Sequence, residues 1–381
     1  MAIYLDNAAT SYPKPSKVYE AVSNYMRDLG ASPGRGSYQA ARKADEIIYN
    51  TRELLAELFG IDDLTRMVFT CNVTESINLA LKGFLKAGDH VITTQMEHNA
   101  VWRSLKVLEN QRRIQISTLH CPKGLSFDLR ELESTICPET RLVVVNHASN
   151  VTGTIMPVKE VGHICAAKKI PLLVDSAQTA GVLPINVQEM KIDLLAFTGH
   201  KGLLGPTGTG GLYIAPGIVL DPLKQGGTGG DSLLEQQPEH LPDRYEAGTL
   251  NAAGIAGLGA GVRFILDQGL EKIRYHEIEL TGYAIDKLCK IPNLVIYGPQ
   301  KAEERTAVIS FNFSNIAPEE ITYVLDEVYE IMARSGLHCA PQAHKTIGTV
   351  DGGTVRISLG YYNTKEDVDA LIAALNEIAA A

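Results

Sequence analysis

Short apolar runs alternate with segments of helical periodicity from about residue 65 to residue 215. This alternation is typical of β-α-β units, in which helices join consecutive parallel strands. We expect strands at 67–70, 91–93, 142–145, 172–174, 194–197 and 212–214. A helix is expected over 74–85, where Ile77, Leu81 and Phe84 share one face. The middle of the chain therefore predicts a large, mostly parallel α/β sheet.

The segments on either side of this region have other patterns. Two amphipathic helices are expected before it, because apolar residues share one helical face over 18–29 and again over 47–59. After residue 260 the order becomes helix, strand, helix, strand, helix, with strands near 307–313 and 355–359 and helices near 318–332 and 365–379. The sequence therefore predicts a large domain over 15–260 and a smaller α+β domain made of 1–14 and 261–381.

Polar or glycine-rich segments follow the predicted strands. They lie at 71–75, 97–99, 146–152, 175–178 and 198–201. In open α/β sheets, ligands bind beyond the carboxyl ends of the strands. We therefore expect these segments to converge on one pocket.

Composition excludes several function classes. The 381 residues include 35 Lys and Arg against 44 Asp and Glu, and the formal net charge of −9 has the wrong sign for neutralising nucleic-acid phosphates. No apolar run approaches the ~20 residues of a membrane helix. The first residues also lack the basic and then apolar pattern of a signal peptide. We expect a cytoplasmic protein without nucleic-acid or membrane partners.

The cysteines are too few for a disulfide scaffold, since there are six in 381 residues and no Cys-x-x-Cys pair. Reduced thiols are the expectation, and any of them could be a nucleophile. No zinc-site spacing occurs, so we expect no metal. We interpret all of them except Cys339 as small buried or neutral residues: Cys71, Cys121, Cys137, Cys165 and Cys289.

A lysine and an aspartate at neighbouring strand ends carry the strongest chemical signal. Asp175 ends the apolar run 171–174, and Lys201 follows the next predicted strand beside small residues. Such a lysine can form a Schiff base, and such an aspartate can hold a pyridinium N–H. Either residue alone is more often a solvated lysine or a capping aspartate. Together with the polar segments around them, the pair predicts pyridoxal 5'-phosphate as cofactor.

Other residues on the same segments could complete a cofactor site. Thr74 begins a helix directly after a strand, and the free N–H groups of a helix N-terminus bind phosphate. His98 lies on another strand-end loop, where an imidazole can stack on a pyridine ring and move protons. Further candidates for the cofactor cradle are Gln178, Thr198 and His200.

A set of short motifs occurs in one order along the chain. They are Asp6-Asn7-Ala8-Ala9-Thr10, Thr74-Glu75, Glu97-His98-Asn99, Ser149-Asn150-Val151-Thr152-Gly153, Asp175-Ser176-Ala177-Gln178, Thr198-Gly199-His200-Lys201 and Arg334-Ser335-Gly336-Leu337-His338-Cys339-Ala340. Together they closely resemble the cysteine desulfurases of the class V aminotransferase group. The resemblance covers residue 4 to about residue 363 and implies a fold-type I, aspartate-aminotransferase-like transferase. The motif around Cys339 is far more specific than the others, which class V enzymes share.

The resemblance implies a role for each candidate residue. Lys201 would hold the cofactor and shuttle the substrate Cα proton, and Asp175 would keep the ring nitrogen protonated. Gln178 would contact the ring hydroxyl, and His98 would stack on the ring. The phosphate would be bound by Thr74, Thr198 and His200, and Thr249 would reach in from a second subunit of a homodimer. The substrate carboxylate would be bound by Arg356 with the help of Asn150.

Cys339 is the residue that would carry sulfur. The resemblance implies that L-cysteine becomes L-alanine while its sulfur passes to Cys339 as a persulfide, for delivery to an acceptor protein in processes such as iron–sulfur cluster assembly. The thiolate is the reactive form of cysteine, so Cys339 needs a depressed pKa or a nearby base, and His338 is a candidate. Residues 336–348 are expected to form a short, glycine-containing loop of the kind that depends on a partner to remove sulfur.

Alternatives stay open on the sequence alone. Another class V aminotransferase or lyase would use Lys201 and Asp175 but would have no use for a loop thiol. A selenocysteine lyase or cysteine sulfinate desulfinase need not require Cys339. A nicotinamide-binding protein is disfavoured, because the glycine-rich segments 208–211 and 227–230 do not follow the Gly-x-Gly-x-x-Gly pattern.

The chain departs from the family pattern at two places. Asn72 and Val73 stand where relatives often have Gly and Thr, which removes a hydroxyl from the phosphate loop. Tyr38 stands where many relatives have histidine, and we assign no role to it.

Overall fold

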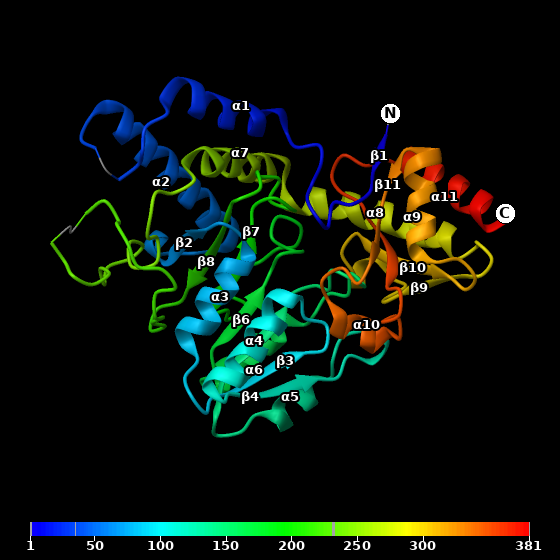
Figure 1. Ribbon diagram of the computed structural model, residues 1–381, viewed down its shortest axis with the longest axis horizontal. Helices are drawn as coiled ribbons and strands as arrows, with labels where there is room; N and C mark the ends of the chain where they lie inside the picture. Colours follow the sequence, from blue (N-terminus) through cyan, green and yellow to red (C-terminus); the bar gives the residue numbers. More distant parts are fainter. Residues whose placement is uncertain (1, 35, 231–232, 381) are drawn as a thin grey trace.

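The computed structural model describes residues 2–34, 36–230 and 233–380 (Figure 1). Its central feature is a seven-stranded sheet with the strand order β2-β8-β7-β6-β5-β3-β4. The strands are β2 (Met67–Thr70), β3 (His90–Thr94), β4 (Gln115–Leu119), β5 (Thr140–Asn146), β6 (Leu172–Asp175), β7 (Leu194–Thr198) and β8 (Gly210–Ile214). β8 is antiparallel to both of its neighbours, and the other strand pairs are parallel. The predicted, mostly parallel sheet is confirmed.

Each predicted strand lies within one of these strands, but β4 was missed. Its residues, Gln115 to Leu119, are mostly polar and partly exposed. β4 lies at the sheet edge beside β3, so an apolar run is not required there. The hydrophobic pattern therefore identified the buried strands and not this edge strand.

Helices cover both faces of the sheet. α3 (Val73–Phe84) and α4 (Asn99–Arg112) pack on one face, and α2 (Gln39–Phe59), α6 (Val158–Lys168) and α7 (Ala252–Gln268) pack on the other. Successive residues of one strand enter the two cores alternately, because side chains in a strand point to opposite faces. In β5, for example, Val143 and Val145 enter one core, and Leu142 and Val144 enter the other.

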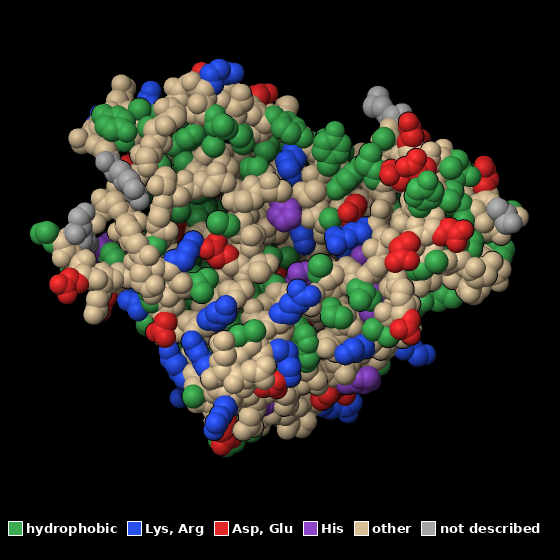
Figure 2. Space-filling view, viewed as in Figure 1, with side chains coloured by type: hydrophobic (Ala, Val, Ile, Leu, Met, Phe, Trp, Pro, Cys, Tyr) green, Lys and Arg blue, Asp and Glu red, His purple; other side chains and the backbone are tan. Residues whose placement is uncertain are grey.

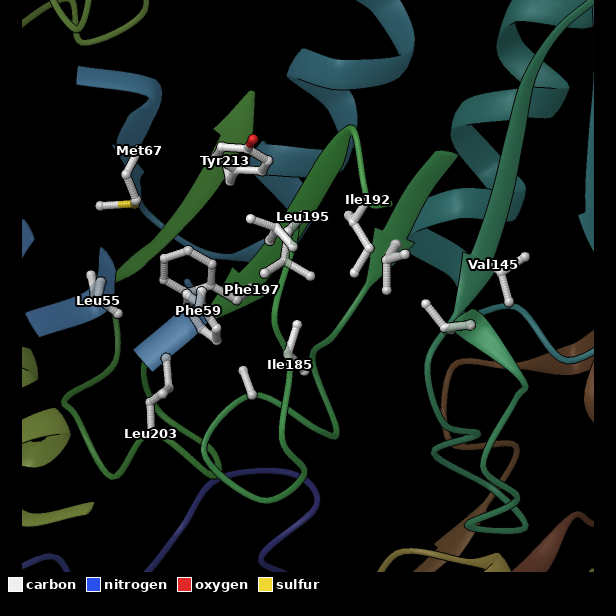
Figure 3. Packing of buried hydrophobic residues seen from close by; sticks show 14 of the residues in the cluster. Leu55, Phe59, Met67, Val145, Ile185, Ile192, Leu195, Phe197, Leu203 and Tyr213 are labelled. Carbon is white, nitrogen blue, oxygen red and sulfur yellow. The ribbon is translucent and has the colours of Figure 1, made fainter. Parts of the chain in front are cut away.

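Figure 3 shows the core between α2 and the sheet. Leu55 and Phe59 of α2 point toward Leu195 and Phe197 of β7, and the rings of Phe59 and Phe197 have centroids 5.2 Å apart. Tyr213 of β8 closes the same core from the neighbouring strand. This packing fixes β7, and with it the segment that carries Lys201.

A second group of elements lies in the C-terminal part of the chain. A four-stranded sheet with the order β12-β13-β10-β9 is covered by helices. The bounds are α8 (Leu270–Leu288), β9 (Leu294–Tyr297), β10 (Val308–Phe313), α9 (Pro318–Tyr329), β12 (Arg334–Gly336), α10 (Pro341–Ile347), β13 (Thr354–Ser358) and α11 (Lys365–Ala380). The remaining elements are α1 (Ser16–Asn24), a π-helix at Tyr25–Leu29, α5 (Leu129–Thr135), and 3₁₀ turns at Leu64–Arg66, Pro122–Gly124 and Ala302–Glu304.

The N-terminal strand joins this C-terminal part. β1 (Ile3–Tyr4) pairs in parallel with β11 (Ile331–Met332), and Leu5 is fully buried in the core formed with α8, α9 and α11. The predicted domain division, 15–260 against 1–14 with 261–381, stays a prediction. None of the helices in the described ranges is both long and apolar enough to cross a membrane.

Two local predictions in the C-terminal part were wrong. The helix expected over 318–332 ends at Tyr329, because Glu330 adopts a left-handed conformation with φ 54° and the next residues form β11. The loop expected over 336–348 contains helix α10, in which Ala343 and His344 are fully buried. A helix of seven residues is too short to give a clear periodic pattern.

Candidate active site

Lys201 and Asp175 come together at the carboxyl ends of two adjacent parallel strands. Asp175 is the last residue of β6 and is 4% exposed, and its Oδ1 accepts a hydrogen bond from the Ala177 N–H at 2.9 Å. Burial raises the pKa of Asp175, while the Ala177 N–H and the charge of Lys201 oppose that rise. The charges of Asp175 and Lys201 therefore act on each other.

The amine of Lys201 is easily deprotonated. Burial lowers the pKa of Lys201 from 10.5 to about 8, and the neighbouring Asp175 carboxylate offsets part of this fall. Arg356 and Arg334 add to the depression through their positive charges. A buried lysine that is partly neutral near pH 7 to 8 is suited to nucleophilic and base chemistry.

His98 is held as a neutral imidazole at the start of α4. Its Nδ1 accepts a hydrogen bond from the Ala100 N–H at 3.0 Å, so its proton is on Nε2. Burial, together with the charges of Lys201 and Arg334, lowers the pKa of His98 to about 4. A neutral ring beside a cationic lysine can stack on an aromatic cofactor.

One pocket of about 400 Å³ brings together residues from three separate segments. Thr74 at the start of α3, His98 at the start of α4 and Cys339 all line it. Figure 2 shows Lys and Arg side chains gathered over α3 and α4, and Lys82 and Arg103 of these helices line the same pocket. Only two of the five strand-end segments expected to share one pocket line it, 71–75 and 97–99. Gln178 and Lys201 line a different pocket, together with Ser358 of β13.

The start of α3 differs slightly from the prediction. The helix begins at Val73, and Asn72 caps it through a hydrogen bond from the Glu75 N–H to its Oδ1 at 3.0 Å. The side chain of Thr74 is exposed. The departure from the family pattern at Asn72 therefore supplies a helix cap and leaves the Thr74 hydroxyl accessible.

Arg356 and Asn150 form a second buried cluster. Arg356 lies in β13 and is 1% exposed; its Nη2 donates to Asp6 Oδ1 at 2.6 Å and its Nη1 donates to the Asn150 carbonyl at 3.1 Å. Asn150 donates from Nδ2 to the His338 carbonyl at 2.6 Å. Within the described residues, Arg356 Nε and Asn150 Oδ1 are buried without a hydrogen-bond partner. Such unpaired atoms are costly unless a ligand satisfies them.

The remaining cofactor candidates lie on the expected segments but are held in different ways. Gln178 donates from Nε2 to the Ala8 carbonyl at 3.1 Å, and Thr198 is 1% exposed with its hydroxyl 3.4 Å from the Thr209 carbonyl. His200 has a buried Nδ1 without a partner in the described part of the chain. Burial and the charges of two lysines lower the pKa of His200 to about 4.

Thr249 is not brought into this cluster by its own chain. It lines a different pocket with Arg52 and Glu246, and those two side chains form a buried ion pair at 2.9 Å. The predicted role of Thr249 toward a second subunit stays a prediction.

Cys339 lies in a tight, exposed turn between β12 and α10. His338 and Cys339 both have left-handed backbone conformations, with φ 45° and φ 57°. The Cys339 carbonyl accepts a hydrogen bond from the Asn99 N–H at 2.8 Å, which ties the turn to the start of α4 next to His98. The thiol is exposed and lines the same pocket as His98.

His338 does not have the environment expected of a base for Cys339. It is 3% exposed, and its Nε2 donates to the Thr354 carbonyl at 3.1 Å. Burial and the charge of Arg356 lower the pKa of His338 to about 2. The hydrogen bond to Thr354 anchors the turn to β13.

Glu97 and Asp6 were quoted in motifs but received no role from the sequence. Glu97 is fully buried, and its Oε1 accepts hydrogen bonds from the Asn146 N–H at 3.0 Å and the Thr94 hydroxyl at 2.8 Å. Burial raises the pKa of Glu97 to about 8. Glu97 thus joins the ends of β3 and β5, and Asp6 holds Arg356. In the sequence, the only signals of these roles were the position of Glu97 next to His98 and the place of Asp6 in the first motif.

The comparisons with known proteins agree with this geometry. The family described as Aminotransferase class-V matches residues 3–371. Two relatives described as probable cysteine desulfurases are each 35% identical. The one from Methanothermobacter thermautotrophicus aligns over 99% of this chain and 94% of its own length, and the one from Halalkalibacterium halodurans aligns over 98% and 92%.

Solved structures show the same likeness over the whole chain. The apo structure of a cysteine desulfurase from Thermococcus onnurineus NA1 has a TM-score of 0.94 and 34% identity, and the match covers 100% of this chain and 95% of that one. The cysteine desulfurase CsdA from Escherichia coli has a TM-score of 0.88 and 29% identity, with 100% and 94% covered. The fold-type I transferase fold expected from the motifs is confirmed.

Proposed function

The chain belongs to the aminotransferase class-V family, and from that premise we propose that it is a pyridoxal phosphate-dependent cysteine desulfurase. It converts L-cysteine to L-alanine and takes the sulfur onto Cys339 as a persulfide. The observation that carries this proposal is the position of Cys339. Its exposed thiol shares a pocket with His98 and Thr74, and its backbone is bonded to the start of α4.

The residues at the strand ends fit pyridoxal phosphate. Asp175 offers a buried carboxylate for the ring nitrogen, and neutral His98 offers a flat face for stacking. The exposed Thr74 hydroxyl at the first turn of α3 and the unpaired Nδ1 of His200 are suited to phosphate oxygens. When bound, pyridoxal phosphate supplies a protonated ring that draws electrons from the Cα of an attached amino acid.

Lys201 moves the proton of the reaction. Because burial lowers its pKa to about 8, a useful fraction of Lys201 is neutral near pH 7.5, so Nζ can accept the Cα proton of the substrate. The proton stays on Nζ until it is returned to the three-carbon product. Asp175 stabilises the charged amine during this interval through its nearby carboxylate.

Arg356 and Asn150 orient the substrate. Asp6 and the Asn150 carbonyl hold two nitrogens of the guanidinium, while Arg356 Nε and Asn150 Oδ1 have no partner within the described residues. A carboxylate beside the free guanidinium edge and an ammonium or amide group beside Asn150 Oδ1 would satisfy both atoms. An amino acid carries both kinds of group.

Cys339 takes the sulfur in a direct displacement. Its Sγ attacks the substrate sulfur, and a new S–S bond forms while the Cβ–S bond breaks. The electron pair of the broken bond stays with the three-carbon fragment, which takes up protons and leaves as alanine. The exposed position of the turn then presents the persulfide to an acceptor protein.

Further parts of the proposal concern the assembly. We propose that the protein acts as a cytoplasmic homodimer in which Thr249 of each chain contacts the phosphate bound by the other, and that its sulfur feeds processes such as iron–sulfur cluster assembly. Exposed apolar side chains in and beside α1 support an interface there, and Figure 2 shows apolar side chains over this helix. Tyr12 before α1, Tyr19 in α1 and Met26 in the π-helix that follows are 59%, 51% and 70% exposed.

The test is the stoichiometry of products from L-cysteine. With a reductant present, the wild-type protein should form equal amounts of alanine and sulfide, and Cys339→Ser should form neither. Cys289→Ser, which removes another exposed thiol, is the matched control and should keep full activity. If Cys339→Ser retains alanine formation from L-cysteine, the displacement by Cys339 is wrong. Activity of both proteins on selenocysteine or cysteine sulfinate alone would favour the lyase alternative.

A further inference from the structure

A second cysteine and histidine meet at the opposite end of the large sheet. His90 is the first residue of β3, the strand whose other end leads to His98. Cys137 lies in the turn before β5, and His90 is paired in register with Thr140 of β5. The Sγ of Cys137 is 3.3 Å from the Nδ1 of His90. The thiol and the imidazole are therefore in hydrogen-bond contact away from the candidate active site.

Hydrogen bonds orient the His90 ring toward the thiol. Nε2 is 2.9 Å from the hydroxyl of Ser117 in β4, and Nδ1 is 2.8 Å from the hydroxyl of Thr140. The Thr140 oxygen also accepts the Cys137 N–H at 2.9 Å, which fixes the turn that carries the thiol. In the tautomer with its proton on Nε2, His90 can donate to Ser117, and Nδ1 can accept from the Thr140 hydroxyl or from the Cys137 thiol. The Thr140 hydroxyl also lies 3.4 Å from Cys137 Sγ. A nucleophile, a base and a residue that orients the base are thus in contact.

Burial separates the roles of the two residues. His90 is 4% exposed, while Cys137 is partly exposed. Burial lowers the pKa of His90, and the charge of Glu139 offsets only part of this, so the ring is neutral at pH 7 and able to accept a proton. A partly exposed thiol next to a base that can take its proton is suited to nucleophilic attack, whereas structural cysteines that are fully buried are inert.

The other cysteines outside the candidate active site lack this arrangement. Cys121 and Cys165 are buried, and burial raises the pKa of each to about 12. Cys71 is exposed, but burial of its sulfur and the adjacent Glu75 raise its pKa. Cys289 is exposed and its Sγ contacts the amide oxygen of Gln300 at 3.7 Å. Cys289 is therefore a matched control, since its thiol is exposed to solvent and contacts an amide oxygen instead of an imidazole.

We propose that Cys137 is a thiol-modification site that forms mixed disulfides with small disulfide compounds, with His90 as its base. His90 Nδ1 takes the thiol proton, and Cys137 Sγ attacks one sulfur of the disulfide. A new S–S bond forms to Cys137 as the old one breaks, and the departing thiolate takes the proton from His90. Cys137 is oxidised and the departing half is reduced, so no other reactant is needed.

The first test compares two thiols in one protein. Cys339→Ser protein, which lacks the thiol of the proposed reaction, is incubated with 2-hydroxyethyl disulfide, a neutral probe, and adducts at each cysteine are followed by peptide mass spectrometry. Cys137 should be modified at least about tenfold faster than Cys289, since a positioned base typically contributes ~100- to 10,000-fold. A rate at Cys137 equal to or below that of Cys289 overturns the proposal, whatever the desulfurase assay shows.

The second test removes the base. His90→Gln keeps a side chain that can bond Ser117 and should lower the Cys137 rate to that of Cys289, while the Cys289 rate stays unchanged. Ser117→Ala leaves both reacting residues in place and should lower the Cys137 rate about threefold by loosening the ring. A folded variant of His90 with an unchanged Cys137 rate overturns the role of His90. If neither variant folds, the comparison of Cys137 with Cys289 decides.

Discussion

Two arginines are completely buried in the C-terminal part of the chain, and their surroundings differ. Arg305 precedes β10 and donates to backbone carbonyls through all its nitrogens: Nε to Val308, Nη1 to Pro299, and Nη2 to Val308 and Tyr297. Arg356 in β13 donates to Asp6 and to the Asn150 carbonyl, but its Nε has no partner within the described residues. Both side chains are almost inaccessible to water.

The difference is the one expected between a structural arginine and the substrate-binding arginine proposed for Arg356. Arg305 is surrounded by acceptors, so its desolvation is offset within the protein and it joins the loop before β10 to the sheet. Two nitrogens of Arg356 donate hydrogen bonds, but its Nε has no partner within the described residues, and neither has the Oδ1 of Asn150. The charge of Arg356 also acts on Lys201. Variants of the Arg305 region should therefore change stability, and variants of the Arg356 region should change chemistry.

The largest effect is expected at Lys201, which belongs to the Arg356 region. Lys201→Ala removes the proposed proton carrier and should reduce alanine formation from L-cysteine by more than about a thousandfold. Its melting temperature should stay near that of the wild type, because burying the charged amine of Lys201 is itself unfavourable for folding. Lys168→Ala, on the exposed end of α6, is the control and should retain full activity. A large fall in the melting temperature of Lys201→Ala would show that Lys201 has a structural role like that of Arg305.

The next largest effect concerns Arg305. Arg305→Met leaves several buried carbonyls without donors and should lower the free energy of unfolding by about 3 kcal/mol. Urea denaturation followed by circular dichroism measures this change, and Arg130→Met at an 88% exposed side chain should alter it by less than about 0.5 kcal/mol. The KM for L-cysteine of folded Arg305→Met should not change. A raised KM without loss of stability would reverse the assignment.

A smaller effect is expected from Arg356→Lys. The variant keeps the positive charge near Asp6 but loses the planar fork, so the KM for L-cysteine should rise by about a hundredfold. Initial rates over a range of cysteine concentrations separate KM from kcat. An unchanged KM with a fallen melting temperature would show that Arg356 acts as Arg305 does.

The smallest effect is a pH dependence of cofactor uptake. Only neutral Lys201 can attack the aldehyde of pyridoxal phosphate, and the pKa of Lys201 is lowered to about 8. The rate at which cofactor-free protein takes up pyridoxal phosphate should therefore rise about tenfold per pH unit below pH 8 and level off above it. Visible absorbance follows this rate. A constant rate between pH 6 and pH 8 would contradict the lowered pKa.

Much of the fold was predictable because its strands are buried on both faces. The runs that became β5, β6 and β7 are apolar for that reason, and the polar residues at and after their ends marked Asp175 and Lys201 as candidates. β4 was missed because an edge strand can remain polar. α10 was missed because a seven-residue helix has fewer than two full periods of hydrophobic pattern.

The parts of the site that the sequence could not predict are contacts between distant positions. Asp6 and Arg356 are 350 residues apart, and Glu97 bonds to Asn146 across two strands. No local pattern indicates which acid will face which base, since the fold brings them together. The burial of His338 was missed for the same reason, because Thr354, which accepts its hydrogen bond, belongs to another strand.

The pairing of β1 with β11 and of Asp6 with Arg356 has a consequence for synthesis on the ribosome. β1 and Asp6 leave the exit tunnel first, but their partners, β11 and Arg356, are synthesised near the end of the chain. At ~5–20 residues per second, Asp6 waits roughly 20 to 70 s for Arg356. A nascent chain that stops before β13 contains every strand of the large sheet but lacks Arg356, the residue proposed to bind the substrate carboxylate. Prematurely terminated products should therefore be inactive even when the large sheet has folded.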